Sequence, residues 1–314
     1  MTTLSTSAFY DTATYNMTQL SKQTAALQTQ ISTGDKVQYA YQNPVVSAQM
    51  RALTQADTLA TANTANTNVA KTQLTQADDT LSQFTNIVSS IQTLATQAAS
   101  ATLTDQQRSS IGTQINSYYQ NLVSLANTKD ASGNALFGGQ EGSGDAYTLD
   151  SSGNATYAGT SSAPTLSLGQ GLTVTTGVTG PEFLNYTSGG QSTNLLSVVK
   201  NLATTLQSGS SSSGTNSGTS ALATAANSAL TQLSDGLNAI TTAQTVVGAR
   251  LSWVNTTSAI QTQQSTLRAQ QESNIGGTDI TSTVAQLQET MTVLQASQAS
   301  FVKVSGLSLF SMLS

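Results

Sequence analysis

The sequence predicts a mainly α fold: a long, coiled-coil-like helical bundle built from the N- and C-terminal segments, with a small β-rich lobe inserted in the middle. Two observations carry this prediction. Apolar residues recur every seven positions along much of the 314-residue chain, and this period is typical of helices packed with a left-handed supercoil. A glycine-rich stretch at 129–145 ends the period, and alternating polar and apolar residues follow it, as in strands.

The first predicted helix ends near the STGD sequence at 32–35. Its apolar positions follow a strict 3,4 spacing from Tyr10 through Leu27 to Ile31, so they share one face of a helix. Pro44 then stands where a second helix can begin, because the first turn of a helix does not need the N–H that proline lacks.

The second helix is expected to be long. Its seven-residue series runs from Leu53 to Ala95, and Phe84 belongs to the other apolar position of the repeat. Thr104 and Gln107 have the spacing of a capping box, in which each side chain satisfies a backbone N–H of the other. A third helix is therefore predicted to start there.

The middle of the chain is predicted to form β-hairpins. The sequences AYTLDSSGNATYAG (146–159) and TLSLGQGLTVTTG (165–177) alternate in polarity around Gly and Asn turns. Because the insert is short, we expect one small β-rich lobe.

Helical spacing resumes at Leu195 and, after a Ser/Gly-rich stretch, continues from Ala226 to Val254 with an interruption at Gln244. The NIGGTD sequence at 274–279 is the last break. The final helix then carries a 4,3 apolar series that leads into a hydrophobic tail, whose residues after Gly306 need not be helical. This series consists of Ile280, Val284, Leu287, Met291 and Leu294.

These elements suggest four parts. The predicted parts are terminal helices that pair on assembly (1–40 and 275–314), a helical rod (41–140 and 191–274), an outward β-rich lobe (141–190) and a flexible Ser/Gly loop (208–220).

Composition excludes several function classes. Only 8% of the residues are charged and the net charge is −5, which argues against nucleic-acid binding, since phosphate neutralisation needs a clustered basic surface. The chain has no Cys and no His, which removes thiol and His-dependent catalysis and most zinc or haem sites. No apolar run is long enough for membrane insertion. The first 20 residues lack the basic and apolar regions of a cleaved signal peptide.

Few residues are candidates for chemistry. Glu141, Asp145, Asp150 and Glu182 could in principle include a pair of glycosidase carboxylates, but solvated loop carboxylates are far more common. Trp253 adjoins Val254 of the apolar series, so packing is favoured over ligand stacking. We predict no enzymatic activity, no cofactor and no metal.

Two distant blocks together resemble the bacterial flagellin superfamily. The N-terminal block contains QISTGDKV, NPVVSAQMRAL and LVSLANTKDASGNALFGG, and the C-terminal block contains VVGARLSWV and LQASQASFVKVSGLSLFSML. The NALFGG motif and the SGLSLF ending are more similar to hook-filament junction proteins than to filament flagellins. In NALFGG the residues are Asn134, Leu136, Phe137, Gly138 and Gly139, with Ala135 between the first two. The sequence departs from the family at YQNP (41–44) and at STGD.

The resemblance implies a structural subunit of the bacterial flagellum. It implies extracellular assembly after export without a cleaved signal peptide, with hook-associated protein 1, flagellin, further copies of the chain and a cytoplasmic export chaperone as partners. Apolar faces of the two terminal helices would then form the assembly interface. These residues are Met17, Leu20, Leu27, Ile31, Val284, Leu287, Met291, Leu294, Phe301, Leu307 and Phe310.

Two alternatives remain at this point. A filament flagellin or flagellin-like subunit shares both blocks and differs in the motif and the ending. A secreted carbohydrate-binding protein would use the β-rich lobe as its binding site. The hydrophobic tail, the strongest family signature, is also where we expect disorder in the monomer.

Overall fold

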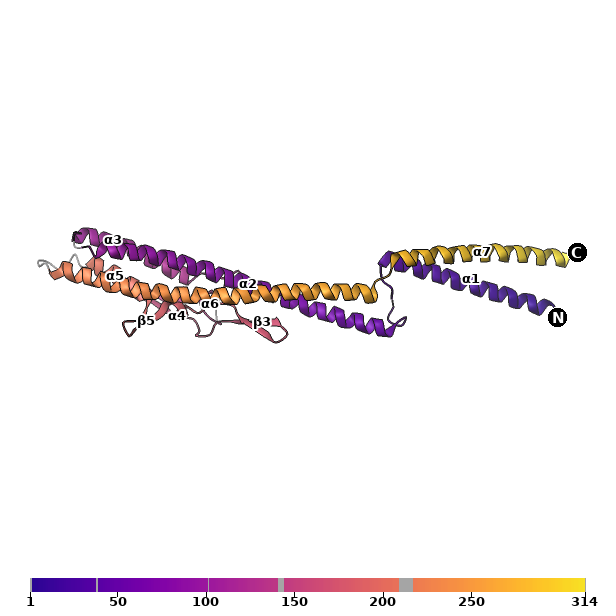
Figure 1. The fold of residues 1–314 in the computed structure, drawn as a ribbon, viewed down its shortest axis with the longest axis horizontal. Coiled ribbons are helices and arrows are strands. Elements are labelled where there is room, and N and C mark those ends of the chain that lie inside the picture. Colours follow the sequence, from indigo (N-terminus) through magenta and orange to yellow (C-terminus); the bar gives the residue numbers. More distant parts are fainter. Residues whose placement is uncertain (1, 38, 101, 141–143, 209–216, 314) are drawn as a thin grey trace. The chain divides into compact units, whose positions relative to one another are not determined.

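The computed structural model describes the backbone of residues 2–37, 39–100, 102–140, 144–208 and 217–313, and it leaves the side chains of 2–7, 217–221 and 306–313 undescribed. Within these ranges it confirms a mainly helical fold with a small β insert (Figure 1). The helices are α1 (Thr2–Thr33), α2 (Pro44–Ala98), α3 (Asp105–Ala126), α4 (Gly180–Leu184), α5 (Leu195–Ser208), α6 (Ser217–Gly276) and α7 (Ile280–Leu313).

The insert consists of three antiparallel strand pairs, each forming its own two-stranded sheet. Both predicted hairpins are confirmed, and a third follows them around the Gly189–Gly190 turn. The pairs are β1 (Tyr147–Leu149) with β2 (Ala155–Tyr157), β3 (Thr165–Gly169) with β4 (Leu172–Thr175), and β5 (Asn185–Ser188) with β6 (Gln191–Asn194).

The chain divides into two compact units. One, the terminal unit, comprises 1–59 and 262–314; the other, the central unit, comprises 60–261. The two long helices α2 and α6 contribute residues to both. The four-part division predicted from the sequence stays a prediction.

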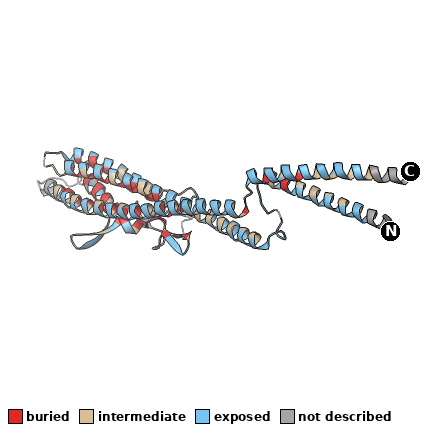
Figure 2. Ribbon diagram, turned by 45° about the vertical axis from the view of Figure 1, so that its right-hand side comes forward, coloured by how far each residue is buried: buried red, intermediate tan, exposed pale blue. Residues whose placement is uncertain are grey.

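The central unit contains the main hydrophobic core. Side chains from α2, α3, α5, α6 and the strands bury one another in it, as the red segments of these helices show in Figure 2. Phe84 of α2 meets Phe183 of α4 edge-on at 5.2 Å between ring centroids, and Phe137 lies 4.9 Å from Phe183. This aromatic cluster attaches the β-rich insert to the helices, since rings at these separations attract one another beyond the area they bury.

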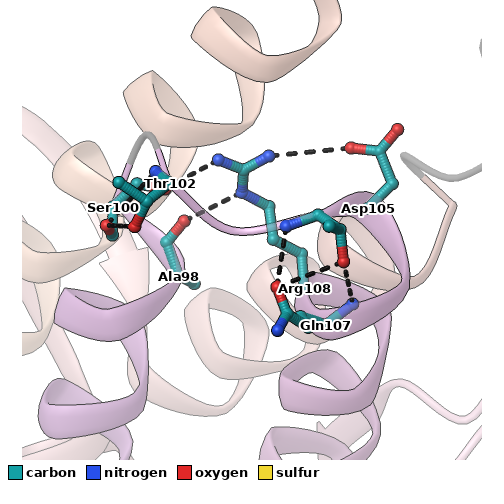
Figure 3. Close-up of polar contacts among 7 residues, drawn as sticks. Ala98, Ser100, Thr102, Asp105, Gln107 and Arg108 are labelled. Carbon is teal, nitrogen blue, oxygen red and sulfur yellow. Dashed lines mark hydrogen bonds and ion pairs between the residues drawn. The ribbon is translucent and has the colours of Figure 1, made fainter.

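The turn between α2 and α3 is held by a buried arginine (Figure 3). The predicted capping box of Thr104 and Gln107 is present. Fully buried Arg108 donates from Nε to the carbonyl of Ala98 at 3.1 Å and from Nη2 to the carbonyl of Ser100 at 2.7 Å. These carbonyls lie at the end of α2, where no intrahelical donor remains for them, so Arg108 supplies the missing donors.

Four expectations change. Gln244 does not interrupt the packing of α6, because Ala243 occupies the buried position and Gln244 donates to Ser82 instead. Trp253 is exposed rather than packed, although its neighbour Val254 is buried. Helix α7 continues past Gly306 to Leu313, since glycine costs a helix only about 1 kcal/mol. The predicted loop at 208–220 is replaced by helix at Ser208 and from Ser217, and its centre at 209–216 lies outside the described residues.

Candidate assembly interface

The predicted interface residues lie on α1 and α7, which form an antiparallel pair within the terminal unit (Figure 1). Near the chain ends, the rings of Tyr10 and Phe301 meet edge-on at 5.5 Å. At the opposite end of the pair, the N–H of Thr278 donates to the carbonyl of Gly34 at 2.8 Å. The expectation that this pairing depends on assembly stays a prediction.

The face of α1 that packs in this unit is the predicted one. Met17, Leu20 and Ile31 are half-buried at 3,4 spacing, and Leu27 among them is 7% exposed. Such partial burial is what one partner helix provides, because the side chains of a two-helix pair remain open to water along their flanks.

The face of α7 is turned from the predicted one. Thr283 and Thr290 are its buried positions, whereas Met291 is 39% exposed. Both threonine hydroxyls donate to carbonyls of the preceding turn, Thr283 to Asp279 and Thr290 to Gln286, each at 2.7 Å. The hydroxyls are therefore satisfied within their own helix and need no partner across the pair, which lets threonine occupy positions that the sequence analysis reserved for apolar residues.

The other predicted residues of α7 whose side chains are described all have intermediate burial. Val284, Leu287 and Leu294 are half-buried, and so is Phe301, beside a small groove of about 200 Å³ between α1 and α7. Leu307 and Phe310 belong to α7, but their side chains lie outside the described residues.

The two connections that the sequence analysis treated only as helix breaks are joined to each other. Lys36 donates its N–H to the carbonyl of Gly276 at 2.7 Å, and Asp35 and Gly277 form an antiparallel bridge. Gly34 has a φ of +77°, a conformation that glycine adopts without the steric cost other residues incur. A Cβ on Gly276 would lie 2.9 Å from the methyl carbon of Met50, so the small residue permits close packing there. Glycine in both breaks was the available sequence signal.

The NALFGG motif lies where the helical segment meets the insert. Phe137 is fully buried, and its carbonyl accepts hydrogen bonds from the Tyr157 hydroxyl at 3.1 Å and from the Gly180 N–H at 3.0 Å. Leu136 and Gly138 are also buried, whereas Asn134 is exposed in the preceding turn. Gly139 has a φ of +81°, and a Cβ there would collide with Thr160. The motif therefore joins the end of the helical segment to the insert.

The acidic residues near the insert form no shared site. Asp145 pairs with Lys129 at 3.3 Å, Asp150 accepts backbone N–H groups of its own turn, and Glu182 caps α4. Glu141 lies outside the described residues. In the part of the chain that is described, no group of three potential metal ligands occurs. Each described carboxylate thus has a local structural partner.

One charged cluster connects α2 with α6 inside the terminal unit. The Arg268 Nε lies 2.6 Å from an Asp57 carboxylate oxygen, and this hydrogen bond lowers the pKa of Asp57 from its ordinary value. The pKa of Glu272 is raised, by partial desolvation and then by the negative charge of Asp57. In a chain with so few charges, this cluster is a charged contact between the two helices.

A family model of the bacterial flagellin N-terminal helical region matches residues 4–141. Flagellar hook-associated protein 3 of Escherichia coli strain K12 is 25% identical over 90% of both chains, and that of Salmonella typhimurium strain LT2 is 25% identical over 98% of both. The crystal structure of flagellar hook-associated protein 3 from Legionella pneumophila is 15% identical, has a TM-score of 0.65, and aligns over 72% of this chain and 98% of its own.

The structural comparison shows a shared fold.

Among the helices described, none combines the length and hydropathy needed to cross a bilayer.

Proposed function

We propose that the chain, which is similar to hook-associated protein 3 along nearly its whole length and to the flagellin N-terminal helical region over residues 4–141, is a structural subunit of the flagellum that forms the junction between hook and filament. The observation that carries this proposal is the coverage: the alignment to the Salmonella protein includes 98% of this chain, both terminal segments and the insert among them.

Assembly would supply burial that the terminal unit lacks. Leu27 is the only large apolar side chain buried in the described α1–α7 pair, while Val302 is 69% exposed. Burying apolar surface contributes about 25 cal/mol per Å², and this gain would offset the entropy lost on ordering both chain ends. We propose that terminal helices fold fully as subunits join, whereas the central unit folds in the monomer.

The proposed partners follow from this role. Hook-associated protein 1 would bind on the hook side, flagellin on the filament side, and further copies of the chain would complete the layer. A cytoplasmic chaperone would cover the C-terminal segment before export, and the chain would leave without a cleaved signal peptide. A structural role also agrees with the acidic residues near the insert, since those that are described have local structural partners.

Deletion of the gene tests the proposal. We expect hooks without filaments and flagellin released into the medium, with filaments restored by the intact gene. Filaments that persist on the hooks of the deletion strain would refute the junction role. Purified protein distinguishes the filament-flagellin alternative, because a filament flagellin would polymerise alone into long filaments, and a junction protein would stop at a short layer.

A charged substitution in α7 tests the division of labour between the units. Leu287→Asp places a carboxylate at a half-buried position of the α1–α7 pair, and we expect loss of junction assembly with nearly unchanged circular dichroism of the monomer. Gln295→Asp, on the exposed side of the same helix, is the matched control and should assemble. Loss of the monomer fold in Leu287→Asp would contradict the proposed division.

A further inference from the structure

Helix α6 carries a second set of heptad positions that remain exposed in the described structure. Within the central unit, Val246, Trp253 and Ile260 are seven residues apart and are 40%, 37% and 49% exposed. Thr242, Ala249 and Thr256 alternate with them, also exposed. Together these six residues, here named the outer seam, have the 4,3 spacing of a helix-packing face. They lie on a different side of α6 from the buried Val247 and Val254.

The outer seam is built like the buried contacts of this chain. The Thr242 hydroxyl donates to the Asn238 carbonyl at 2.8 Å, and the Thr256 hydroxyl donates to the Ser252 carbonyl at 3.0 Å. Thr290 in the α1–α7 pair is bonded in the same way. Since these hydroxyls are satisfied within their own helices, the threonines can pack through their methyl groups. This chain thus already packs its helices through large apolar residues that alternate with Ala or Thr.

The stretch of α6 that carries the outer seam has almost no charge of its own. Between Ile240 and Thr262, Arg250 is the single charged residue, and its Nη1 donates to the Gly177 carbonyl of the insert at 2.5 Å. An ordinary coiled-coil partner is selected through charges that flank its seam. A partner of the outer seam would instead have to match a nearly uncharged stretch of helix. This chain, in which 8% of the residues are charged, could supply such a helix.

We propose that the outer seam is the surface on which a helix of a second copy of this chain packs in the assembled junction. The inference rests on the proposed function, in which several copies come together. It adds which surface of one copy contacts the next. The single tryptophan of the protein lies at the centre of the surface, and tryptophan is strongly enriched among residues that dominate binding energy at interfaces. Small neighbours such as Ala249 allow another helix to approach it closely.

The lone tryptophan gives a direct test in the intact protein. We expect Trp253 fluorescence to shift to shorter wavelength, and acrylamide quenching to fall, when the purified chain assembles into junctions. Emission and quenching that match the monomer after assembly would overturn the inference.

Cysteine chemistry identifies the occupant, because the chain has no cysteine of its own. In Thr256→Cys, labelled with a benzophenone maleimide before assembly, irradiation should give a product of twice the chain mass. A product with flagellin or with a hook protein instead would overturn the proposed occupant, and so would the absence of any cross-link. Thr148→Cys, exposed in the insert, is the control and should give no such product.

The two proposals can fail separately. If the gene deletion removes filaments while Thr256→Cys yields no homodimer, the junction role stands and the outer seam is refuted. If filaments persist on the deletion strain while the homodimer forms, the surface between copies stands and the junction role is refuted. Ile260→Asp adds a readout in cells: it should leave the circular dichroism of the monomer unchanged and detach filaments, whereas normal filaments would contradict the proposal.

Discussion

The central unit and the α1–α7 pair use the same seven-residue repeat, yet they bury it very differently. In the central unit, Leu74, Leu81 and Phe84 are inaccessible to solvent. In the α1–α7 pair, most residues of the repeat are half-buried, and Leu27 alone among the large apolar residues is buried. The sequence spacing on α1 is as regular as that on α2.

The difference comes from the number of neighbours around each helix. In the central unit, α2, α3, α5, α6 and the insert share one core. In the described part of the terminal unit, α1 and α7 pack mainly against each other, so their repeat buries one stripe and leaves its flanks in water. A heptad pattern therefore predicts which face packs, while the count of surrounding helices decides how much stability the packing provides. The same mutation should cost much more in one unit than in the other.

The largest effect is expected for Phe84→Ala in the central unit. Removing this ring leaves a cavity beside Phe137 and Phe183, and large-to-small changes of this kind cost about 3–5 kcal/mol. Urea unfolding followed by circular dichroism would measure the loss of unfolding free energy. A loss below about 1 kcal/mol would show that the aromatic cluster does not anchor the core.

A smaller loss is expected for Arg108→Met. The carbonyls of Ala98 and Ser100 would lose their donors, and an unsatisfied buried acceptor costs about 1–3 kcal/mol. Asp105→Ala removes only the 3.6 Å ion pair with an exposed carboxylate, so it should change the unfolding free energy by less than about 1 kcal/mol. Equal effects of both substitutions would indicate that the ion pair, rather than the two carbonyls, determines the role of Arg108.

Leu27→Ala should be the mildest of the core truncations. A Leu→Ala change in a closed core costs 2–5 kcal/mol, but a gap between two helices is open to water and can close by a small movement, so about 1–2 kcal/mol is expected. Amide hydrogen exchange would report it as faster exchange confined to α1 and α7. Faster exchange in the central unit as well would contradict the independence of the two units.

Local chemistry made much of the fold predictable. Pro44 opens α2, the capping box at Thr104 begins α3, and glycine turns define the first two hairpins. The third hairpin was not predicted, because Tyr186 is the only large apolar residue in its two strands, NYTS and QSTN. The buried position of Arg108 was not predicted, because a hydrophobic pattern assigns a charged residue to the surface. Only the fold reveals the carbonyls that it caps.

The face that packs within the terminal unit was predictable on α1 and only partly on α7. On α1 the packed face consists of the apolar series itself. On α7 the packed face includes Thr283 and Thr290, and single-residue hydropathy gives no sign that a threonine hydroxyl is satisfied within its own helix. The outer seam was not predicted for the same reason, because the hydroxyls of Thr242 and Thr256 are also satisfied within their own helix.

The smallest expected effect concerns the charged cluster of the terminal unit. Because the folded-state pKa of Asp57 is lowered from 3.8, its ion pair with Arg268 stabilises the fold above about pH 4 and is lost as the pH falls through the lowered value. Glu272 has the opposite sign: its pKa is raised above 4.5, so its protonation on acidification first relieves repulsion with Asp57. The local alignment of α2 and α6 should therefore loosen only in acid, after Glu272 is neutral.

Arg268→Gln isolates this effect. Without the guanidinium, the pKa of Asp57 should rise toward its ordinary value, and the pKa of Glu272 should rise further, since the cation that favours both ionised forms is gone. Carboxyl carbon chemical shifts recorded against pH would measure both. Arg51→Gln removes the same charge from an exposed position on α2, so it should leave both values in place. An unchanged Asp57 pKa in Arg268→Gln would mean that the pair does not persist in solution, as is common for exposed ion pairs, and that apolar contacts alone align these two helices.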